Sequence, residues 1–329
     1  LLVVGCVFRQ GKLRNIIDSS LFWLAFFWYL FLIGTRFEIG VDWSNYEAIF
    51  NGTTVGGSGF GLASVFNIGF SALVILTKWF DFTYYEFNLS MACISLLLIF
   101  QAIRRSTERI IILVYIAPYL LTLVLMNYSR QALAVAILFY LIFAGFRMSW
   151  RRKTLYFFVG LAFHPSFALM YHWSYIKSRT YVLLAIGLCF VALASVVGAA
   201  YIDNYVTNAM QSTGALPRLL VYGLPIWMCF VLRTPVRDDR SRYIVLAGLN
   251  FSIVCAFCIA MNLTTVADRL GVYLIPFSAY ALQVQLVQSR NGDILASLYV
   301  VASSVLLLVW MMYSEWATAW LPYKTWIQI

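Results

Sequence analysis

The chain has 329 residues, of which 63% are hydrophobic and only 11% are charged. Because a water-soluble domain carries about 25% charged residues, this composition excludes a soluble globular protein and predicts a protein embedded in lipid. The net charge of +10 does not indicate nucleic-acid binding, since the Lys and Arg residues stand in short clusters between apolar runs, as in proteins that follow the positive-inside rule.

Apolar runs long enough to cross a bilayer, which takes about 20 residues, follow one another along the whole chain. The runs lie at approximately 17–35, 87–103, 110–127, 131–147, 154–164, 166–176, 181–200, 219–232, 243–262, 270–287 and 294–313. The chain starts with the apolar stretch Leu1–Phe8, so we expect that its N-terminus has been trimmed within a span. Residues 1–329 are therefore predicted to form one all-α, polytopic membrane domain with about 11–13 transmembrane helices.

The basic clusters predict which connections face the cytoplasm. They stand at 9–14, 104–109, 147–153, 177–179, 233–242 and 290. Alternation then places the other connections outside, at 36–58, 127–131, around 164–166, 201–218, 263–269 and 314–329. The apolar segment 60–80 would invert every later cluster if it crossed the bilayer, so we expect a re-entrant or outer-surface helix there.

The first outer connection, residues 36–58, begins RFEIGVDWSNYEAIF and combines charged with aromatic residues. The carboxylate of Asp42 suits proton transfer from a sugar hydroxyl, or it orients Arg36. Trp43 and Tyr46 suit stacking on a pyranose ring, although interfacial anchoring explains them equally well. We predict that this loop forms part of a site for an anionic, lipid-linked glycan, with a solvated loop that anchors a helix end as the alternative.

Two further arginines lie at the heads of later spans. Arg130 stands between LLTLVLM and ALAVAILFYLIF, and Arg269 follows Asp268. An arginine at membrane depth costs about 2.5–3.5 kcal/mol on insertion scales and usually marks a functional site. The alternatives are snorkelling of Arg130 to headgroups and neutralisation of Arg269 by Asp268. Since a guanidinium donates paired hydrogen bonds to phosphate oxygens, we predict that Arg36, Arg130 and Arg269 bind a pyrophosphate.

His164 lies at the tip of a hairpin, in GLAFHPSFAL. Its unperturbed pKa of about 6.5 suits acid–base catalysis near neutrality, and a hydrogen bond to the backbone is the alternative. No His and carboxylate cluster has the spacing of metal ligands. Cys255 and Cys258 form a CxxC without histidine or charged neighbours. We therefore predict no metal and no other cofactor.

Three stretches resemble signatures of the EpsG family, a branch of the Wzy-like polysaccharide polymerases. GTRFEIGVDWSNYEAIF is similar to the family's G-x-R-x-x-x-G-x-D-[YW]-x-x-Y pattern, NYSRQALAVAIL to its N-x-x-R-Q before an apolar run, and GLAFHPSFAL to its F-H-x-S hairpin. They span Gly34 to Leu169, and the C-terminal half matches through a weaker Arg269…Tyr273 pattern. Pro165 departs from the family, where a polar residue often follows the histidine. The resemblance implies these site positions: Arg36, Asp42, Tyr46, Arg130, Gln131, His164 and Arg269.

The resemblance further implies a metal-independent, GT-C-like glycosyltransferase of the bacterial cytoplasmic membrane, with its active site facing the periplasm or exterior. Such enzymes join repeat units carried on undecaprenyl pyrophosphate: a hydroxyl of one lipid-linked unit attacks the anomeric carbon of another. In this scheme His164 and Asp42 are catalytic, and the residues assigned to glycan contacts are Trp43, Tyr46, Gln131 and Tyr273. The implied partners are the donor and acceptor, membrane lipids, a chain-length regulator and a flippase.

Two other classes of function stay open. A flippase for the same lipid-linked sugars should carry intramembrane charges along a path that reaches both faces. A membrane O-acyltransferase should combine a catalytic histidine with a tunnel for the acyl donor, and would leave the arginines without a clear purpose.

Overall fold

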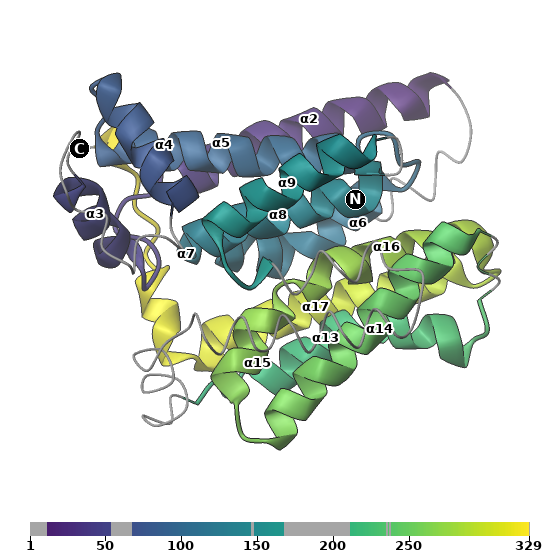
Figure 1. Ribbon diagram of the computed structural model, residues 1–329. Coiled ribbons are helices and arrows are strands. Elements are labelled where there is room, and N and C mark those ends of the chain that lie inside the picture. Colours follow the sequence, from purple (N-terminus) through teal and green to yellow (C-terminus); the bar gives the residue numbers. More distant parts are fainter. Residues whose placement is uncertain are drawn as a thin grey trace.

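The computed structural model describes residues 12–53, 68–145, 148–167, 211–234, 236 and 238–328. Within these ranges the chain is helical, and its only β-bridge joins Arg36 to Thr325. The helices lie side by side in two groups that follow one another in sequence (Figure 1). The predicted all-α membrane bundle is confirmed, whereas the span expected at 181–200 and most of the one at 166–176 lie outside the described residues.

The first group comprises the described residues from 12 to 167 and forms the upper half of Figure 1. Its long elements are α2 (Lys12–Gly34), α5 (Tyr84–Ile103), α6 (Arg109–Ile116), η2 (Ala117–Val124), α7 (Leu125–Asn127), α8 (Ser129–Ala144) and α9 (Trp150–Phe163). The segment η2 is a π-helix, a rare conformation that occurs frequently at functional sites. Two short helices, α3 (Trp43–Gly52) and α4 (Ile68–Trp79), lie at the end of the bundle where α2 finishes and α5 begins.

The second group comprises the described residues from 211 to 328. Its elements are α13 (Ala215–Val231), α14 (Asp239–Ala260), α15 (Thr264–Gly271), α16 (Leu274–Gln288), α17 (Gly292–Tyr313), η5 (Glu315–Ala319) and η6 (Trp326–Gln328). The two groups meet where α6 and α8 pack against α17 and α16. The seam between them therefore joins residues that are far apart in the sequence.

The described residues contain five helices that are long and apolar enough to cross a membrane. They are Ile16–Gly34, Tyr84–Ile103, Arg109–Asn127, Asp239–Ala260 and Gly292–Tyr313. Helices α15 and α16 are long and apolar enough only when they are taken together, and they are bent by 50° at the residues between them, where the sequence predicted one helix over 270–287. Three shorter apolar helices, α4, α8 and α13, accompany them, so the chain is a multi-pass membrane protein.

The helices differ in how much apolar surface they turn outward. On α2, Leu24, Phe27 and Trp28 are each more than half exposed, while α8 buries most of its side chains. A helix that is apolar on all sides belongs in a large core or in lipid, and α8 lies in the protein interior. Exposed apolar side chains such as those of α2 are expected where the solvent is hydrocarbon.

Pro225 lies inside α13, where a proline removes one backbone hydrogen bond. The carbonyl left over is that of Val221, and the Tyr115 hydroxyl donates to it at 3.4 Å. The Pro225 carbonyl accepts a hydrogen bond from the buried Gln285 amide. Neighbouring helices thus satisfy the polar atoms around the proline, which is how membrane helices tolerate one.

The basic and the polar connections lie at opposite ends of the bundle. At one end, Arg109 Nη2 donates to Ser19 Oγ at 2.8 Å and Arg240 Nη2 donates to the Ile142 carbonyl at 2.6 Å. At the other end, the loop after α2, the start of α8, the end of α9, helix α15 and the C-terminal residues lie together (Figure 1). The polar connections therefore converge, as the sequence predicted.

Helix α4 agrees with the expectation that 60–80 does not cross the bilayer, although residues 60–67 lie outside the described part. Arg36, just after α2, donates to Asn88 near the start of α5, so α2 ends where α5 begins, at the same end of the bundle. Lys78 Nζ at the end of α4 donates to the Thr53 carbonyl just after α3, at 2.6 Å. Helix α4 thus covers this end of the bundle.

Candidate functional site

The loop after α2 is paired with residues 314–328, which we call the C-terminal segment. The Phe37 N–H donates to the Lys324 carbonyl at 3.0 Å. The Trp326 N–H donates to the Thr35 carbonyl at 3.1 Å. This two-stranded contact, which the sequence did not predict, joins the chain's last described residues to the loop that carries Asp42.

The position of Asp42 is fixed by contacts on both sides of Gly40. The Gly40 N–H donates to the Ala319 carbonyl at 2.9 Å, and the Asp42 N–H donates to Asn127 Oδ1 at 3.0 Å. Gly40 has a φ of +98°, and a Cβ there would lie 2.9 Å from the Met126 carbonyl oxygen. Only glycine accommodates this conformation and this close approach, so the loop lies directly against the end of α7.

Arg36 lies in the interior and is only 3% exposed. Nη1 donates to the Ile33 carbonyl at 2.7 Å, and Nη2 donates to Asn88 Oδ1 at 3.0 Å and to Ser129 Oγ at 3.4 Å. These acceptors are uncharged and belong to α2, α5 and α8. Arg36 therefore connects three helix ends, and its predicted contact with a pyrophosphate stays a prediction.

Trp43 and Tyr46, predicted to contact a glycan, are each 7% exposed. The Trp43 ring packs edge-on against Tyr84, with centroids 4.9 Å apart. The Tyr46 ring packs against Phe70 and lies 5.4 Å from the guanidinium carbon of Arg130. Both rings support their neighbours, and direct stacking on a sugar remains untested.

Arg130 belongs to the first turn of α8, which starts after a break at Tyr128. The break ends the preceding span and places Arg130 at the polar end of the bundle, partly buried. Its guanidinium carbon lies 5.4 Å from the Tyr46 ring and 5.9 Å from the Phe70 ring. Cation–π contacts of this kind hold a cation without neutralising it.

Gln131 follows Arg130 and was predicted to contact a glycan. Its Nε2 donates to the backbone carbonyl of Arg269, across the seam between the two helix groups. Its Oε1 is buried without a hydrogen-bond partner among the described residues. Gln131 thus ties α8 to α15, and the predicted contact with a sugar is not tested by this arrangement. Tyr273, the fourth predicted glycan contact, is fully buried.

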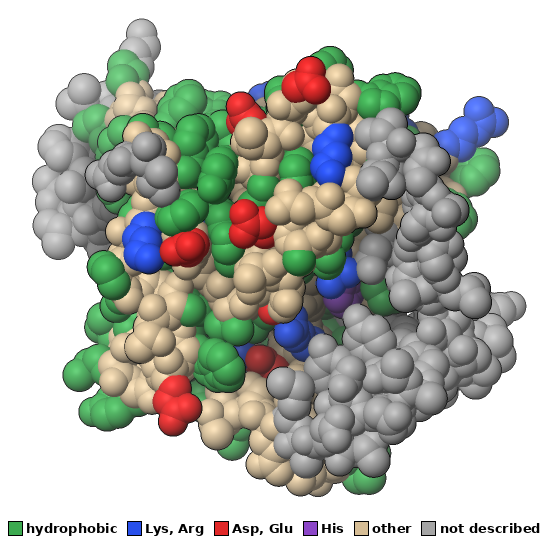
Figure 2. Space-filling model, turned by 90° about the vertical axis from the view of Figure 1, so that its left-hand side faces the viewer, with side chains coloured by type: hydrophobic (Ala, Val, Ile, Leu, Met, Phe, Trp, Pro, Cys, Tyr) green, Lys and Arg blue, Asp and Glu red, His purple; other side chains and the backbone are tan. Residues whose placement is uncertain are grey.

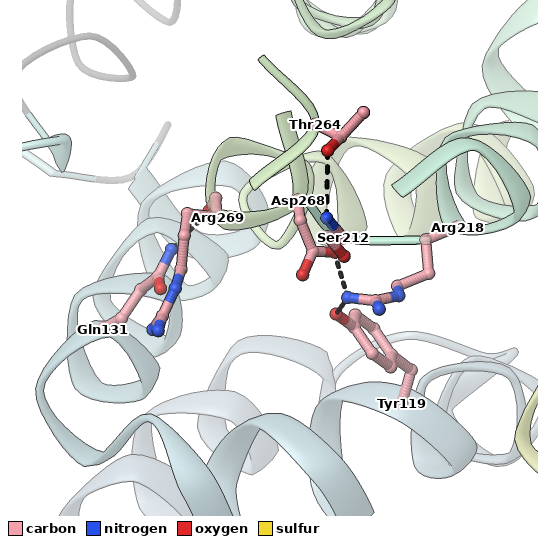
Figure 3. Close-up of polar contacts among 7 residues, drawn as sticks. All are labelled: Tyr119, Gln131, Ser212, Arg218, Thr264, Asp268 and Arg269. Atoms are coloured by element: carbon pink, nitrogen blue, oxygen red, sulfur yellow. Dashed lines mark hydrogen bonds and ion pairs between the residues drawn. The ribbon is translucent and has the colours of Figure 1, made fainter. Parts of the chain in front are cut away.

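Arg269 and Asp268 are adjacent on α15 but point to different helices (Figure 3). The Arg269 side chain extends beside Gln131, and its guanidinium carbon lies 4.2 Å from the Tyr128 ring centroid. Asp268 instead forms an ion pair with Arg218 at the start of α13. The alternative that Asp268 neutralises Arg269 is therefore not what the structure contains.

His164 caps the C-terminal end of α9, where the chain turns. The Ser166 backbone N–H donates to His164 Nδ1 at 3.3 Å, and the Ser166 hydroxyl lies 2.5 Å from the same nitrogen. A backbone N–H can only donate, so this contact favours the neutral tautomer that carries its proton on Nε2. The predicted backbone hydrogen bond is present, and it leaves Nε2 to face other groups.

Asp42, Arg130, His164 and Arg269 form one electrostatic unit, which we call the polar cluster. Burial raises the pKa of Asp42, while the charges of Arg269 and Arg130 oppose that rise. Burial and the same two arginines lower the pKa of His164 to about 3. Each arginine therefore acts on both titratable groups. Residues from the first loop, from α8, from the end of α9 and from α15 are brought together.

Figure 2 looks onto this end of the bundle. The surface is hollowed between the two helix groups, and basic, acidic and histidine side chains gather around the recess. Among the residues that the structure describes, no group of three or more His, Cys, Asp or Glu side chains could hold a metal ion.

In a comparison with protein-family models, the EpsG family matches residues 20–325. The chain belongs to the EpsG family. The EpsG match begins within α2 and ends in the C-terminal segment, so it includes every member of the polar cluster. No curated protein and no solved structure matches the chain.

Three features of this EpsG-family site were missed by sequence reasoning. The ion pair of Arg218 with Asp268 joins residues 50 positions apart, and Asn127 receives a bond from a loop 85 positions away. The pairing of the C-terminal segment with the first loop spans almost the whole chain. The sequence did contain a signal for some of these residues. The pattern N-x-x-R-Q includes Asn127, and Asp268 stands next to Arg269, but neither pattern predicts the partner that the structure shows.

Proposed function

We propose that this EpsG-family chain is a polymerase that joins oligosaccharide repeat units carried on undecaprenyl pyrophosphate. The reaction would take place at the non-cytoplasmic face of the bacterial cytoplasmic membrane, in a metal-independent, GT-C-like enzyme. The observation that supports this most is the polar cluster, because the charges of two arginines from distant elements act on the same carboxylate and the same histidine. Family membership supports the same class of reaction.

Arg130 and Arg269 are proposed to bind the pyrophosphate of the donor. Each guanidinium offers a planar set of donors that matches phosphate oxygens, and each stays charged at all relevant pH values. Both lie against aromatic rings rather than deep in hydrocarbon. Fixed positive charges also stabilise negative charge that develops on the leaving group in the transition state.

Asp42 is proposed as the general base. The acceptor hydroxyl oxygen attacks the anomeric carbon of the donor, and its proton passes to the Asp42 carboxylate. The bond between the anomeric carbon and the pyrophosphate oxygen breaks, and the lipid pyrophosphate leaves between Arg130 and Arg269. His164 is neutral at physiological pH because its pKa is about 3, so we propose that Nε2–H donates a hydrogen bond to a substrate oxygen.

Arg36 is proposed to support the site without contacting the substrate. Its hydrogen bonds fix the end of α2 and the starts of α5 and α8, and the last of these carries Arg130. It therefore supports the geometry of the cluster, and a direct contact with the phosphate would need its side chain to leave three acceptors.

The test uses the purified chain in detergent with lipid-linked repeat units. A polymerase lengthens the units without a sealed membrane, which a gel shows as a ladder of glycan lengths. A flippase moves lipid-linked units across a sealed bilayer and makes no bond, so unchanged units in detergent together with transport in vesicles would contradict the proposal. An O-acyltransferase would add mass without adding sugars.

A further inference from the structure

The chain turns sharply at the end of α9, and Pro165 determines the shape of the turn. A residue that precedes proline is driven to extended backbone, because the proline ring clashes with the helical conformation. His164 accordingly has a φ of −154° and a ψ of 125°, and it ends the helix. The Phe167 N–H donates to the His164 carbonyl at 3.0 Å, so residues 164–167 form a β-turn with Pro165 at its second position, which favours proline.

The turn is held from two sides. Phe167 is fully buried, and its ring packs on α9 at Gly160, where a Cβ would lie 2.6 Å from the ring. The buried ring of Tyr273, from the second helix group, lies beside the imidazole of His164, with ring centroids 6.3 Å apart. The direction of the His164 side chain is therefore set by packing as well as by the turn.

Two donors of Ser166 converge on one nitrogen of His164. The Ser166 backbone N–H lies 3.3 Å from Nδ1, and the Ser166 hydroxyl oxygen lies 2.5 Å from the same atom. The N–H can only donate, so Nδ1 must offer its lone pair and carry no proton. The hydroxyl, which is able to donate or accept, must then donate as well. The remaining proton of the neutral imidazole is thereby placed on Nε2.

We propose that Ser166 is a positioning residue that holds His164 in the Nε2–H tautomer, so that His164 serves the reaction as a hydrogen-bond donor and not as the general base. This rests on the proposed function, in which Nε2–H donates to a substrate oxygen. Nε2 already carries a proton and Nδ1 is occupied by Ser166, so neither nitrogen can take the proton of the acceptor hydroxyl. Ser166 acts through His164 rather than on the substrate.

The first test records nitrogen-15 NMR spectra of the purified full chain in detergent at pH 7, with its histidines labelled. The chain contains two histidines, and the signals that disappear in His164→Gln belong to His164. We expect a protonated Nε2 and an unprotonated Nδ1. A proton on Nδ1, or on both nitrogens, would overturn the inference whatever reaction the protein catalyses.

The second test removes the hydroxyl donor and keeps the backbone donor. Ser166→Ala should move the Nδ1 resonance, because its lone pair loses a donor, and should lower the rate of polymer formation by about tenfold, because the imidazole is less well oriented. Ser166→Thr, which keeps the hydroxyl, should restore both. The matched control is Ser149→Ala at the other end of α9, where the serine side chain makes no capping hydrogen bond. An unchanged Nδ1 resonance in Ser166→Ala would overturn the role of Ser166.

The third test replaces the imidazole by amides of different reach. The amide nitrogen of glutamine lies close to the place of Nε2, and that of asparagine close to the place of Nδ1. His164→Gln should therefore retain at least about tenfold more activity than His164→Asn, and equal activities would contradict the donor role. An unmodified protein that makes no polymer would overturn the proposed function and the donor role with it, while the spectra would still decide whether Ser166 fixes the tautomer.

Discussion

Arg36 has surroundings that differ from those of Arg130 and Arg269, although the sequence predicted the same role for all three. Arg36 is almost fully buried and donates to a carbonyl, an amide and a hydroxyl, each of them uncharged. Arg130 and Arg269 are partly exposed, lie against aromatic rings and shift the pKa of the same carboxylate and imidazole. Residue type predicted one role for all three, whereas the surroundings divide them.

The largest effect on the rate of polymer formation is expected when Arg130 or Arg269 is replaced. Arg130→Gln or Arg269→Gln should each lower the rate of polymer formation by about 100-fold or more. Each substitution removes a positively charged hydrogen-bond donor that would stabilise the negative charge of the departing pyrophosphate. Polymer ladders from purified protein measure this. The matched control is Arg242→Gln, an exposed arginine in the first turn of α14, which should leave the ladder unchanged. Normal ladders from Arg130→Gln would remove the basis of the comparison.

The next largest effect is expected for Asp42, the proposed general base. Asp42→Asn should lower kcat by about 100-fold or more, as expected for loss of a general base. Because burial raises the Asp42 pKa, its neutral form is favoured in the folded state, and the variant should not be less stable at pH 7. Melting temperature and kcat measured on the same preparations check both statements.

The pH dependence of the reaction rate distinguishes whether Asp42 or His164 is the general base. The rate should fall with decreasing pH as Asp42 becomes protonated, at a pKa above its usual value. His164 should contribute no inflection near 6.5, because its pKa in the folded protein is about 3. An acidic limb that persists in Asp42→Asn and vanishes in His164→Gln would reverse the two roles.

Substitution of Arg36 should affect the stability of the protein more than the rate of polymer formation. Arg36→Gln leaves buried acceptors on three helix ends incompletely satisfied, which we expect to lower the free energy of unfolding by about 2–3 kcal/mol. The rate per folded molecule should fall less than tenfold. Denaturation in mixed micelles and active-site-normalised rates give the two values. A stable variant with a 100-fold lower rate would move Arg36 into the group that binds phosphate.

The smallest effect tests the loop that carries Asp42. Gly40→Ala places a Cβ close to the Met126 carbonyl at a φ of +98°, so we expect a loss of about 1–3 kcal/mol in unfolding free energy. Lys324→Ala in the same contact removes only an exposed ion pair with Glu38 and should cost less than about 0.5 kcal/mol. Equal effects of the two substitutions would show that the loop is not held closely against α7.

The sequence predicted the bundle and the convergence of polar connections because hydropathy and basic clusters are local signals. It also singled out Asp42, Arg130, His164 and Arg269, which the structure brings together, because their motifs are short. The break between α15 and α16 was missed, since Gly271 to Leu274 reads as part of one apolar run. The direction of a side chain was equally inaccessible: Arg36, Trp43, Tyr46 and Tyr273 looked available, yet packing from distant helices buries them.

A structure of the chain with a bound prenyl pyrophosphate would show which arginines hold the phosphate. We expect phosphate density within hydrogen-bonding distance of both the Arg130 and the Arg269 guanidinium groups, with Asp42 facing the anomeric position and Arg36 still bonded to Asn88 and Ser129. Phosphate bound elsewhere, or held by Arg36 with Arg130 and Arg269 turned away, would contradict this expectation.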